Sequence, residues 1–220
     1  MTLKAVLFDF DDTIGDREKY ARAAYEEALE KISDISGLEK EAVLQACMVY
    51  DQQGNTDKNY VSDRIEREFG ICLKDCTESH DFNEWWEANL WRFTVVFENA
   101  EKTLKAIREK GYLIGIVTNG SAYGQNLKLE RSGLKDMFDA VVVSGDFGVH
   151  KPDPAIFREA AKRLNVSCEE CMFVGDTFSK DILGAGRAGM KPVWIWTHGP
   201  RVMKADLPVI SDISQITELL

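Results

Sequence analysis

The sequence predicts an α/β fold in which a doubly wound parallel sheet is interrupted by an all-helical insertion. From residue 98 onward, short and nearly continuous apolar runs alternate with helical patterns, as expected of parallel strands covered by helices on both faces. A similar apolar run, Leu3 to Phe8, opens the chain, whereas residues 16–95 contain no convincing strand. We therefore expect a core of residues 1–15 and 96–220 and a helical domain of residues 16–95.

The insertion shows the spacing of amphipathic helices. Its first helix is indicated by four small or apolar residues spaced four positions apart, namely Tyr20, Ala24, Ala28 and Ile32. Glycines at 37, 54 and 70 separate further helical patterns over residues 38–51, 57–69 and 80–92. An aromatic-rich segment, which includes Trp85 and Trp86, fits either a buried helical core or a stacking surface for a nucleobase, and we favour the core.

Strands and helices alternate through the rest of the chain. A helix over 100–110 ends before Gly111, and Asp153-Pro154 starts another helix with a capping residue followed by proline. The expected strands after the first are residues 112–117, 140–143, 171–174, 193–196 and 209–210. The remaining helices are expected at residues 121–132, 179–188 and 214–220.

Composition excludes several classes of partner. The 220 residues include 37 acidic and 27 basic side chains, so the formal net charge is −10. This charge argues against binding to a nucleic acid polymer or to an anionic membrane, and no apolar run approaches the roughly 18 residues of a membrane span. The five cysteines, an odd number, argue against a disulfide framework. We expect reduced thiols in a cytoplasmic protein, with no zinc site at Cys168 and Cys171.

Polar residues follow the strands in a coherent set. Parallel sheets bind ligands beyond the carboxyl ends of their strands, so these residues are expected to share one edge. They are Asp9 and Asp11 after the first strand, Thr118 and Asn119 at the second, Lys151 after the third, and Asp176 and Asp181 at the fourth.

The residue types at this edge indicate phosphoryl chemistry. Three carboxylates from two strands would repel one another unless a hard cation such as Mg²⁺ lay between them. A carboxylate can attack phosphorus to form an aspartyl-phosphate, and a second carboxyl can protonate the leaving oxygen and then deprotonate water. Thr118 and Lys151 supply a hydroxyl and a cation for the phosphoryl oxygens.

Four motifs, in order along the chain, resemble those of the haloacid dehalogenase superfamily of hydrolases. The first, DxDxT, is Asp9-Phe10-Asp11-Asp12-Thr13, and the second is the apolar strand LIGIVTNG with Thr118. The third is Lys151 in KPDPAIF. The fourth, GDxxxxD, runs from Gly175-Asp176 to Asp181, with Lys180 where many relatives have Asn.

The resemblance implies a Rossmann-like core, a helical cap and a role for each residue. Asp9 is expected to be the nucleophile and Asp11 the general acid and base. Mg²⁺ is expected on the Asp9 side chain, the Asp11 main-chain carbonyl and Asp176, with Asp181 orienting a bound water or Lys151. The phosphate is expected at Thr118, Asn119 and Lys151. The resulting hypothesis is a phosphatase for a small phosphorylated metabolite, such as a sugar phosphate or a nucleoside monophosphate.

Several other functions can be compared with this hypothesis on the same residues. A phosphomutase shares all four motifs and stays open, and a catalytically inactive binding domain predicts the loss of a motif, which is not seen. A 2-haloacid dehalogenase lacks the second Asp of the first motif, so Asp11 argues against it. Residues 184–189 match G-x-G-x-x-G, but they lie late in a helix, where small residues favour close packing rather than a dinucleotide.

Overall fold

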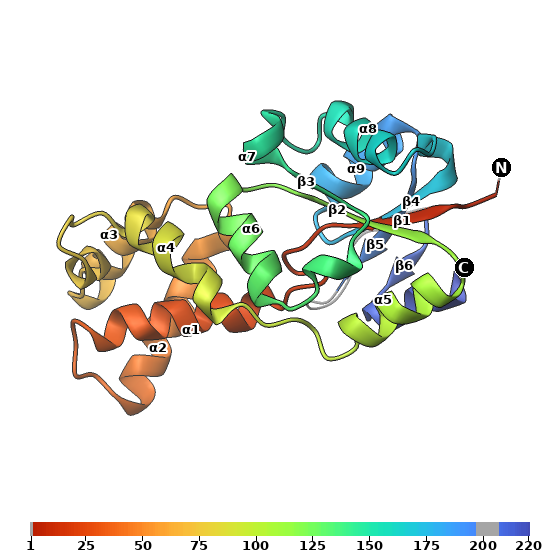
Figure 1. Ribbon diagram of the computed structural model, residues 1–220. Helices are drawn as coiled ribbons and strands as arrows, with labels where there is room; N and C mark the ends of the chain where they lie inside the picture. The colour runs from red at the N-terminus through yellow and green to blue at the C-terminus, as the bar shows by residue number, and fades with distance from the viewer. Residues whose placement is uncertain (1, 197–206) are drawn as a thin grey trace. The chain divides into compact units, whose positions relative to one another are not determined.

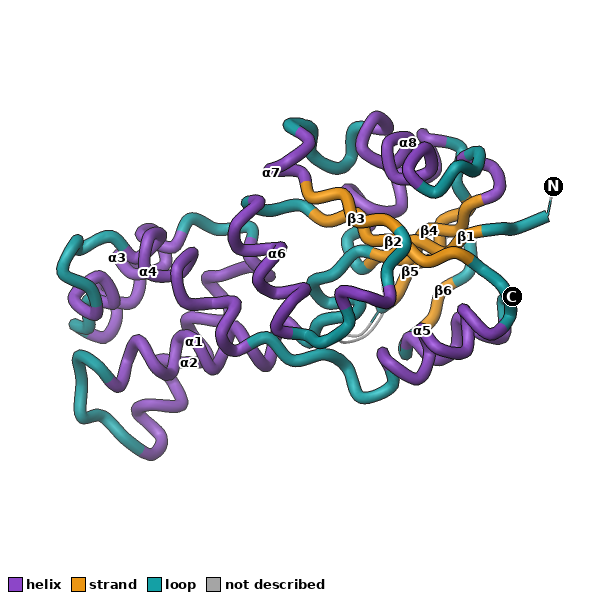
Figure 2. Tube along the Cα trace, viewed as in Figure 1, coloured by secondary structure: helices purple, strands orange, loops and turns teal. Residues whose placement is uncertain are grey.

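A computed structural model describes residues 2–196 and 207–220, and it divides the chain into two compact units. One unit consists of Met1–Asp16 with Val96–Leu220, and the other of Arg17–Val95. The unit that contains both ends of the chain is α/β, whereas residues 17–95, all of which are described, form only helices, turns and loops (Figure 2).

The α/β unit is built on a six-stranded sheet with the order β3-β2-β1-β4-β5-β6, in which every neighbouring pair is parallel. The strands are β1 (Ala5–Phe8), β2 (Leu113–Thr118), β3 (Ala140–Val143), β4 (Cys171–Gly175), β5 (Lys191–Ile195) and β6 (Val209–Ile210). This topology confirms the predicted parallel, Rossmann-like sheet.

Helices cover both faces of the sheet, as the near-continuous apolar strands predict. Figure 1 shows α8 and α9 on one side of the sheet and α5 on the other. The helices of this unit are α5 (Ala100–Glu109), α6 (Ala122–Arg131), the short α7 (Ser144–Phe147), α8 (Pro154–Arg163) and α9 (Leu183–Ala188). Short 3₁₀ helices lie at Lys135–Met137, Cys168–Glu170 and Ile213–Glu218.

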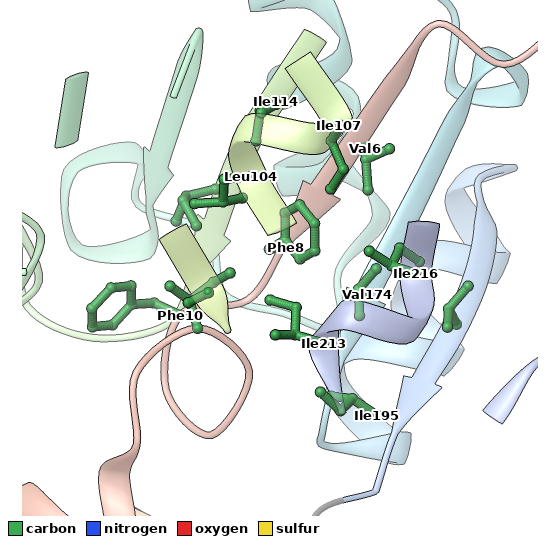
Figure 3. Close-up of a cluster of buried hydrophobic side chains, with 14 of the residues drawn as sticks. Val6, Phe8, Phe10, Leu104, Ile107, Ile114, Val174, Ile195, Ile213 and Ile216 are labelled. Carbon is green, nitrogen blue, oxygen red and sulfur yellow. The ribbon is translucent and has the colours of Figure 1, made fainter. Parts of the chain in front are cut away.

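Alternation along β1 divides its side chains between two hydrophobic clusters. Val6 and Phe8 pack with residues of α5 and of the C-terminal 3₁₀ helix, including Ile107 and Ile213 (Figure 3). Ala5 and Leu7 belong to the opposite cluster, together with buried residues of α8 and α9. Burial of apolar surface stabilises a fold by about 25 cal/mol per Å². Because β1 is buried on both faces, it is held rigidly and its last residue has a defined place.

The register of the sheet sets where β1 delivers its polar residues. Phe8 pairs with Ile116 of β2 and with Val174 of β4. The next residue, Asp9, donates its backbone N–H to the carbonyl of Val174 at 2.9 Å. Asp9 therefore leaves the sheet between the ends of β2 and β4.

One predicted helix, residues 179–188, is not a single regular α-helix. Residues Phe178–Ile182 form a π-helical turn, and α9 begins only at Leu183, whose N–H bonds to the carbonyl of Phe178. Close packing explains Gly184, because a Cβ there would come within 2.6 Å of the Phe157 ring in α8. Gly184 thus allows α8 and α9 to pack closely, as expected of a small residue in this helix.

The helical unit contains α1 (Arg17–Glu30), α2 (Gly37–Asp51), α3 (Lys58–Phe69) and α4 (Phe82–Asn89), with 3₁₀ turns at Gln52–Gly54, Leu73–Cys76 and Leu90–Phe93. It has a separate apolar core in which Tyr25, Phe82 and Trp86 meet. Trp85 stacks on Phe82 with ring centroids 5.4 Å apart. The interpretation of Trp85 and Trp86 as core residues is confirmed.

Two further expectations concern bulk properties. All five cysteines are free thiols. None of the helices in residues 2–196 and 207–220 combines the length and apolar character that a bilayer crossing requires.

Candidate active site

The predicted polar residues gather at the carboxyl edge of the sheet in the α/β unit. Asp9 follows β1, Thr118 ends β2 and Asp176 follows β4. Lys151 comes from the segment between β3 and α8, where the Lys151-Pro152 peptide bond is cis. Asp181 comes from the π-helical turn.

Lys151 is the centre of the arrangement. Its Nζ lies 2.7 Å from Oδ1 of Asp9 and 2.7 Å from Oδ1 of Asp181, and its side chain is only 1% exposed. Burial by itself would lower the pKa of Lys151, but the charges of Asp181 and Asp9 outweigh burial and raise the pKa above its usual range. The ammonium group therefore remains charged.

One ammonium does not balance the carboxylates around it. Oxygen atoms of Asp9, Asp176 and Asp181 all lie within 4.8 Å of one another. Burial, the largest cause, and the charge of Asp181 raise the pKa of Asp9 to about 7, although Lys151 acts in the opposite direction. Burial and the charges of Asp181 and Asp9 also raise the pKa of Asp176. Such a set, made only of oxygen donors and short of positive charge, fits a hard divalent cation such as Mg²⁺.

The approach of Asp181 to this cluster depends on Gly175 and on the π-helical turn. A Cβ on Gly175 would lie 2.5 Å from both Cβ and Cγ of Asp181, so any larger residue would displace that side chain. The turn also directs Oδ2 of Asp181 to the N–H of Thr177, 2.9 Å away. Turns of this kind occur frequently at functional sites. The GDxxxxD spacing is thus explained by one close contact between its ends.

Asp11 lies two residues from Asp9, but its carboxylate has different partners. Lys128 Nζ contacts Asp11 Oδ1 at 3.0 Å and Oδ2 at 2.8 Å, and Gln125 Nε2 donates to Oδ2 at 3.0 Å. The Asp11 carboxylate is not among the oxygens clustered around Lys151. For the cation, the expected contribution of Asp11 is its main-chain carbonyl, which leaves the side chain available for another role.

Lys128 and Gln125 belong to none of the four sequence motifs and were not predicted as site residues. Both lie on α6 and are buried, with residue exposures of 6% and 4%. They share the inward side of the helix with Leu129, three or four residues apart. A lysine and a glutamine on the apolar side of a predicted helix were the available signal.

Thr118 and Asn119, two of the predicted phosphate-binding residues, differ in their surroundings. Thr118 is the last residue of β2 and is 1% exposed. The Asn119 side chain pairs with the backbone of Lys151, because its Oδ1 accepts the Lys151 N–H at 2.8 Å and its Nδ2 donates to the Lys151 carbonyl at 3.1 Å. Asn119 therefore fixes the segment that carries Lys151, and a direct contact of its side chain with phosphate stays a prediction.

Comparison with known proteins adds the family. The model of the haloacid dehalogenase-like hydrolases matches residues 3–189. A glyceraldehyde 3-phosphate phosphatase of Methanopyrus kandleri is 36% identical over 88% of this chain and 84% of its own length. The enzyme of the same name from Methanothermobacter thermautotrophicus is 34% identical over 99% of this chain and 100% of its own.

Solved structures of other proteins also resemble this chain. A HAD phosphatase from Thermococcus onnurineus aligns with a TM-score of 0.64 and 31% identity, over 99% of this chain and 97% of its own. A dehalogenase with an intermediate complex aligns with a TM-score of 0.68 over 100% of this chain and 97% of its own, but at 22% identity it shows likeness of fold alone.

Proposed function

This chain belongs to the haloacid dehalogenase-like hydrolase family, and on that premise we propose that it is a magnesium-dependent phosphatase acting on a small phosphorylated metabolite. The observation that carries the proposal is the cluster of Asp9, Asp176 and Asp181, in which Asp9 and Asp181 share the ammonium group of Lys151. A phosphatase needs a nucleophile beside a strong positive field. This cluster supplies a carboxylate as the nucleophile, and its excess of negative charge calls for a bound cation.

In the proposed first step, a carboxylate oxygen of Asp9 attacks phosphorus as the ester P–O bond breaks. Asp11, in its protonated form, gives its proton to the departing oxygen. The product alcohol leaves, and the phosphoryl group remains on Asp9 as an acyl phosphate. Lys151, held between Asp9 and Asp181, neutralises charge on the phosphoryl oxygens, and the Thr118 hydroxyl donates to them.

In the second step, Asp11 accepts a proton from water as the water oxygen bonds to phosphorus. The bond between phosphorus and Asp9 breaks, which releases inorganic phosphate and restores the carboxylate. Bound Mg²⁺, held by Asp9, the Asp11 carbonyl and Asp176, would supply the charge that lets a carboxylate approach a phosphate dianion. Asp181 acts on the site through Lys151, which it contacts at 2.7 Å.

The relatives direct the choice of substrate. The two relatives from Methanopyrus kandleri and Methanothermobacter thermautotrophicus are glyceraldehyde 3-phosphate phosphatases, so we place a short sugar phosphate first among the substrates, before nucleoside monophosphates and phosphorylated acids.

We also propose that residues 16–95 act as a cap that selects the substrate. Two excess acidic charges among the site residues do not oppose an anionic substrate once a divalent cation is bound.

The test is the release of inorganic phosphate from a panel of those three substrate classes, with Mg²⁺ and with EDTA. We expect hydrolysis with Mg²⁺, loss of activity in EDTA and recovery when Mg²⁺ is added in excess. Asp176→Asn should raise the Mg²⁺ concentration needed for half-maximal rate by about 10-fold or more, because a ligand is weakened.

A matched control lies at the same edge of the sheet. Asp153 caps α8 by accepting the Ala155 N–H at 2.8 Å, and asparagine caps helices equally well. Asp153→Asn should therefore leave the Mg²⁺ requirement unchanged. Absence of hydrolysis across the panel would contradict the proposal, and activity that is indifferent to EDTA would exclude the metal. Transfer of phosphate within a sugar, without its release, would instead indicate a phosphomutase.

A further inference from the structure

Helix α6 carries a pair of side chains that no motif includes, and both contact Asp11. Lys128 Nζ lies across the two carboxylate oxygens, at 3.0 and 2.8 Å, and Gln125 Nε2 adds a third contact at 3.0 Å. The Lys128 side chain is 7% exposed and that of Asp11 is 22% exposed, so the pair is largely shielded from water. Contacts with this geometry hold a carboxylate in one orientation.

The same glutamine also joins two loops of the site. Its Nε2 donates to the carbonyl of Asn119 at 2.9 Å as well as to Asp11. Asn119 in turn holds the backbone of Lys151 through two hydrogen bonds. A single helix face therefore sets the position of Asp11 and supports the segment that positions Lys151.

We propose that Lys128, assisted by Gln125, is a positioning residue that keeps the Asp11 carboxylate apart from the cluster formed by Asp9, Asp176 and Asp181. This inference rests on the proposed function, in which Asp11 moves a proton while its neighbours bind a cation. Without an opposing partner, a carboxylate two residues from Asp9 would be drawn to any divalent ion at the cluster. A carboxylate bound to a metal ion in that way is poorly placed to exchange a proton with the substrate oxygen.

The distribution of charge supports this division. Lys151 is shared by Asp9 and Asp181, whereas Lys128 contacts Asp11. The two ammonium groups thus lie in different parts of the site, one among the carboxylates that fit a cation and one at the carboxylate assigned to proton transfer. Among the described residues named here, carboxylates outnumber ammonium groups, and this excess of negative charge fits a divalent ion.

The first experiment compares steady-state kinetics of Lys128→Met and Lys128→Arg with the wild type in saturating Mg²⁺. We expect Lys128→Met to lower kcat about 100-fold, the size expected when an acid–base group is misplaced, with KM changed less than about 3-fold. Lys128→Arg, which keeps the charge and the reach, should recover at least about a tenth of kcat. The control is Lys135→Met, since Lys135 makes only an exposed ion pair with Glu130 among the contacts described, and its kcat should not change.

The second experiment needs no turnover. Calorimetric titration with Mg²⁺ should show that Lys128→Met binds the ion at least as tightly as the wild type, because a nearby positive charge has been removed. A crystal structure of Lys128→Met with Mg²⁺ should show the Asp11 carboxylate turned away from α6. If this variant does not fold, Lys128→Gln provides the same measurements with a polar side chain retained.

Three outcomes would overturn the inference: unchanged kcat in Lys128→Met, loss of Mg²⁺ binding together with kcat, or an Asp11 carboxylate that stays at its wild-type position. The middle result would mean that Lys128 only supports the fold of the site. Failure of the proposed function is a separate result, because the wild type itself would then hydrolyse no phosphate ester, whereas the titration and the crystal structure would still judge the position of Asp11.

Discussion

Both units of the chain bury a carboxylate beside cations, yet the pKa values of the two carboxyl groups shift in opposite directions. In the helical unit, Asp51 is fully buried and receives Arg17 Nη1 at 2.6 Å and Lys58 Nζ at 2.6 Å. The hydroxyl of Tyr25 and the N–H of Gly54 donate to its two oxygens as well. Burial opposes ionisation, but Arg17 and Lys58 prevail and lower the pKa of Asp51.

In the α/β unit the ratio of cations to carboxylates is the opposite. Asp9 shares the Lys151 ammonium with Asp181, and burial together with the Asp181 charge raises the pKa of Asp9 to about 7. Among the residues that the structure describes, the cluster around Asp51 thus has more cations than carboxylates, whereas the candidate active site has fewer. Burial alone therefore does not mark a functional carboxylate. A functional carboxylate is marked by a shortage of positive charge that a ligand could supply.

The largest effect is expected for Asp9→Asn. It removes the nucleophile without changing the volume of the side chain, so turnover should fall by about 10⁴-fold or more. The midpoint of thermal unfolding should not fall, because the variant also removes one of the carboxylates that repel each other around Lys151. Phosphate release and calorimetric unfolding are the two measurements.

Retained steady-state activity in Asp9→Asn would contradict the role of Asp9. The control is Asp153→Asn, which alters a helix cap near the same sheet edge and should retain both activity and stability.

The second prediction concerns the helical unit. Asp51→Asn removes the buried carboxylate that Arg17 and Lys58 both contact, so the free energy of unfolding should fall by about 3–5 kcal/mol. Urea denaturation of the whole chain measures this loss. The matched control is Glu41→Gln, which breaks an exposed pair with Arg22 and should leave stability unchanged.

A loss in Asp51→Asn no larger than in Glu41→Gln would show that the buried cluster does not stabilise the helical unit. Asp51 would then no longer serve as an example of a buried carboxylate with a structural role.

The smallest effect is a slope in stability with pH, measured without metal. The folded pKa of Asp9, about 7, exceeds the unfolded value of about 4, so the folded state binds the extra proton between these pH values. The contribution of Asp9 to stability is therefore complete below about pH 4 and declines by a few kcal/mol as pH rises to about 7. Asp51, with a lowered pKa, contributes above the unfolded value and loses its contribution as pH falls below it.

Urea denaturation in EDTA at several pH values between 4 and 8 tests the slope. Asp9→Asn should flatten that part of the curve, and Mg²⁺ should reduce the slope in the wild type because it balances the carboxylates. Identical pH dependence in the wild type and in Asp9→Asn would contradict the raised pKa.

The fold was largely predictable because its signals are local. Apolar runs such as Ala140–Val143 and the capping pair Asp153-Pro154 determine strands and helices within a few residues, and alternation with helices implies parallel pairing. The boundaries differ, for example, at the regular helix expected from residue 179, which begins instead with a π-helical turn. In this turn Asp181 accepts the N–H of Thr177 and makes a tertiary contact with Lys151 at 2.7 Å.

The sequence by itself determined which side chains reach the carboxyl edge of the sheet, since each follows the end of a strand and a parallel sheet brings those ends together. Only the tertiary structure decided their partners. It assigned Lys151 to Asp9 and Asp181, turned Asp11 toward Lys128, and gave the Asn119 side chain to the Lys151 backbone. These choices depend on contacts between residues as many as 142 positions apart along the chain, and no local pattern of residues encodes them.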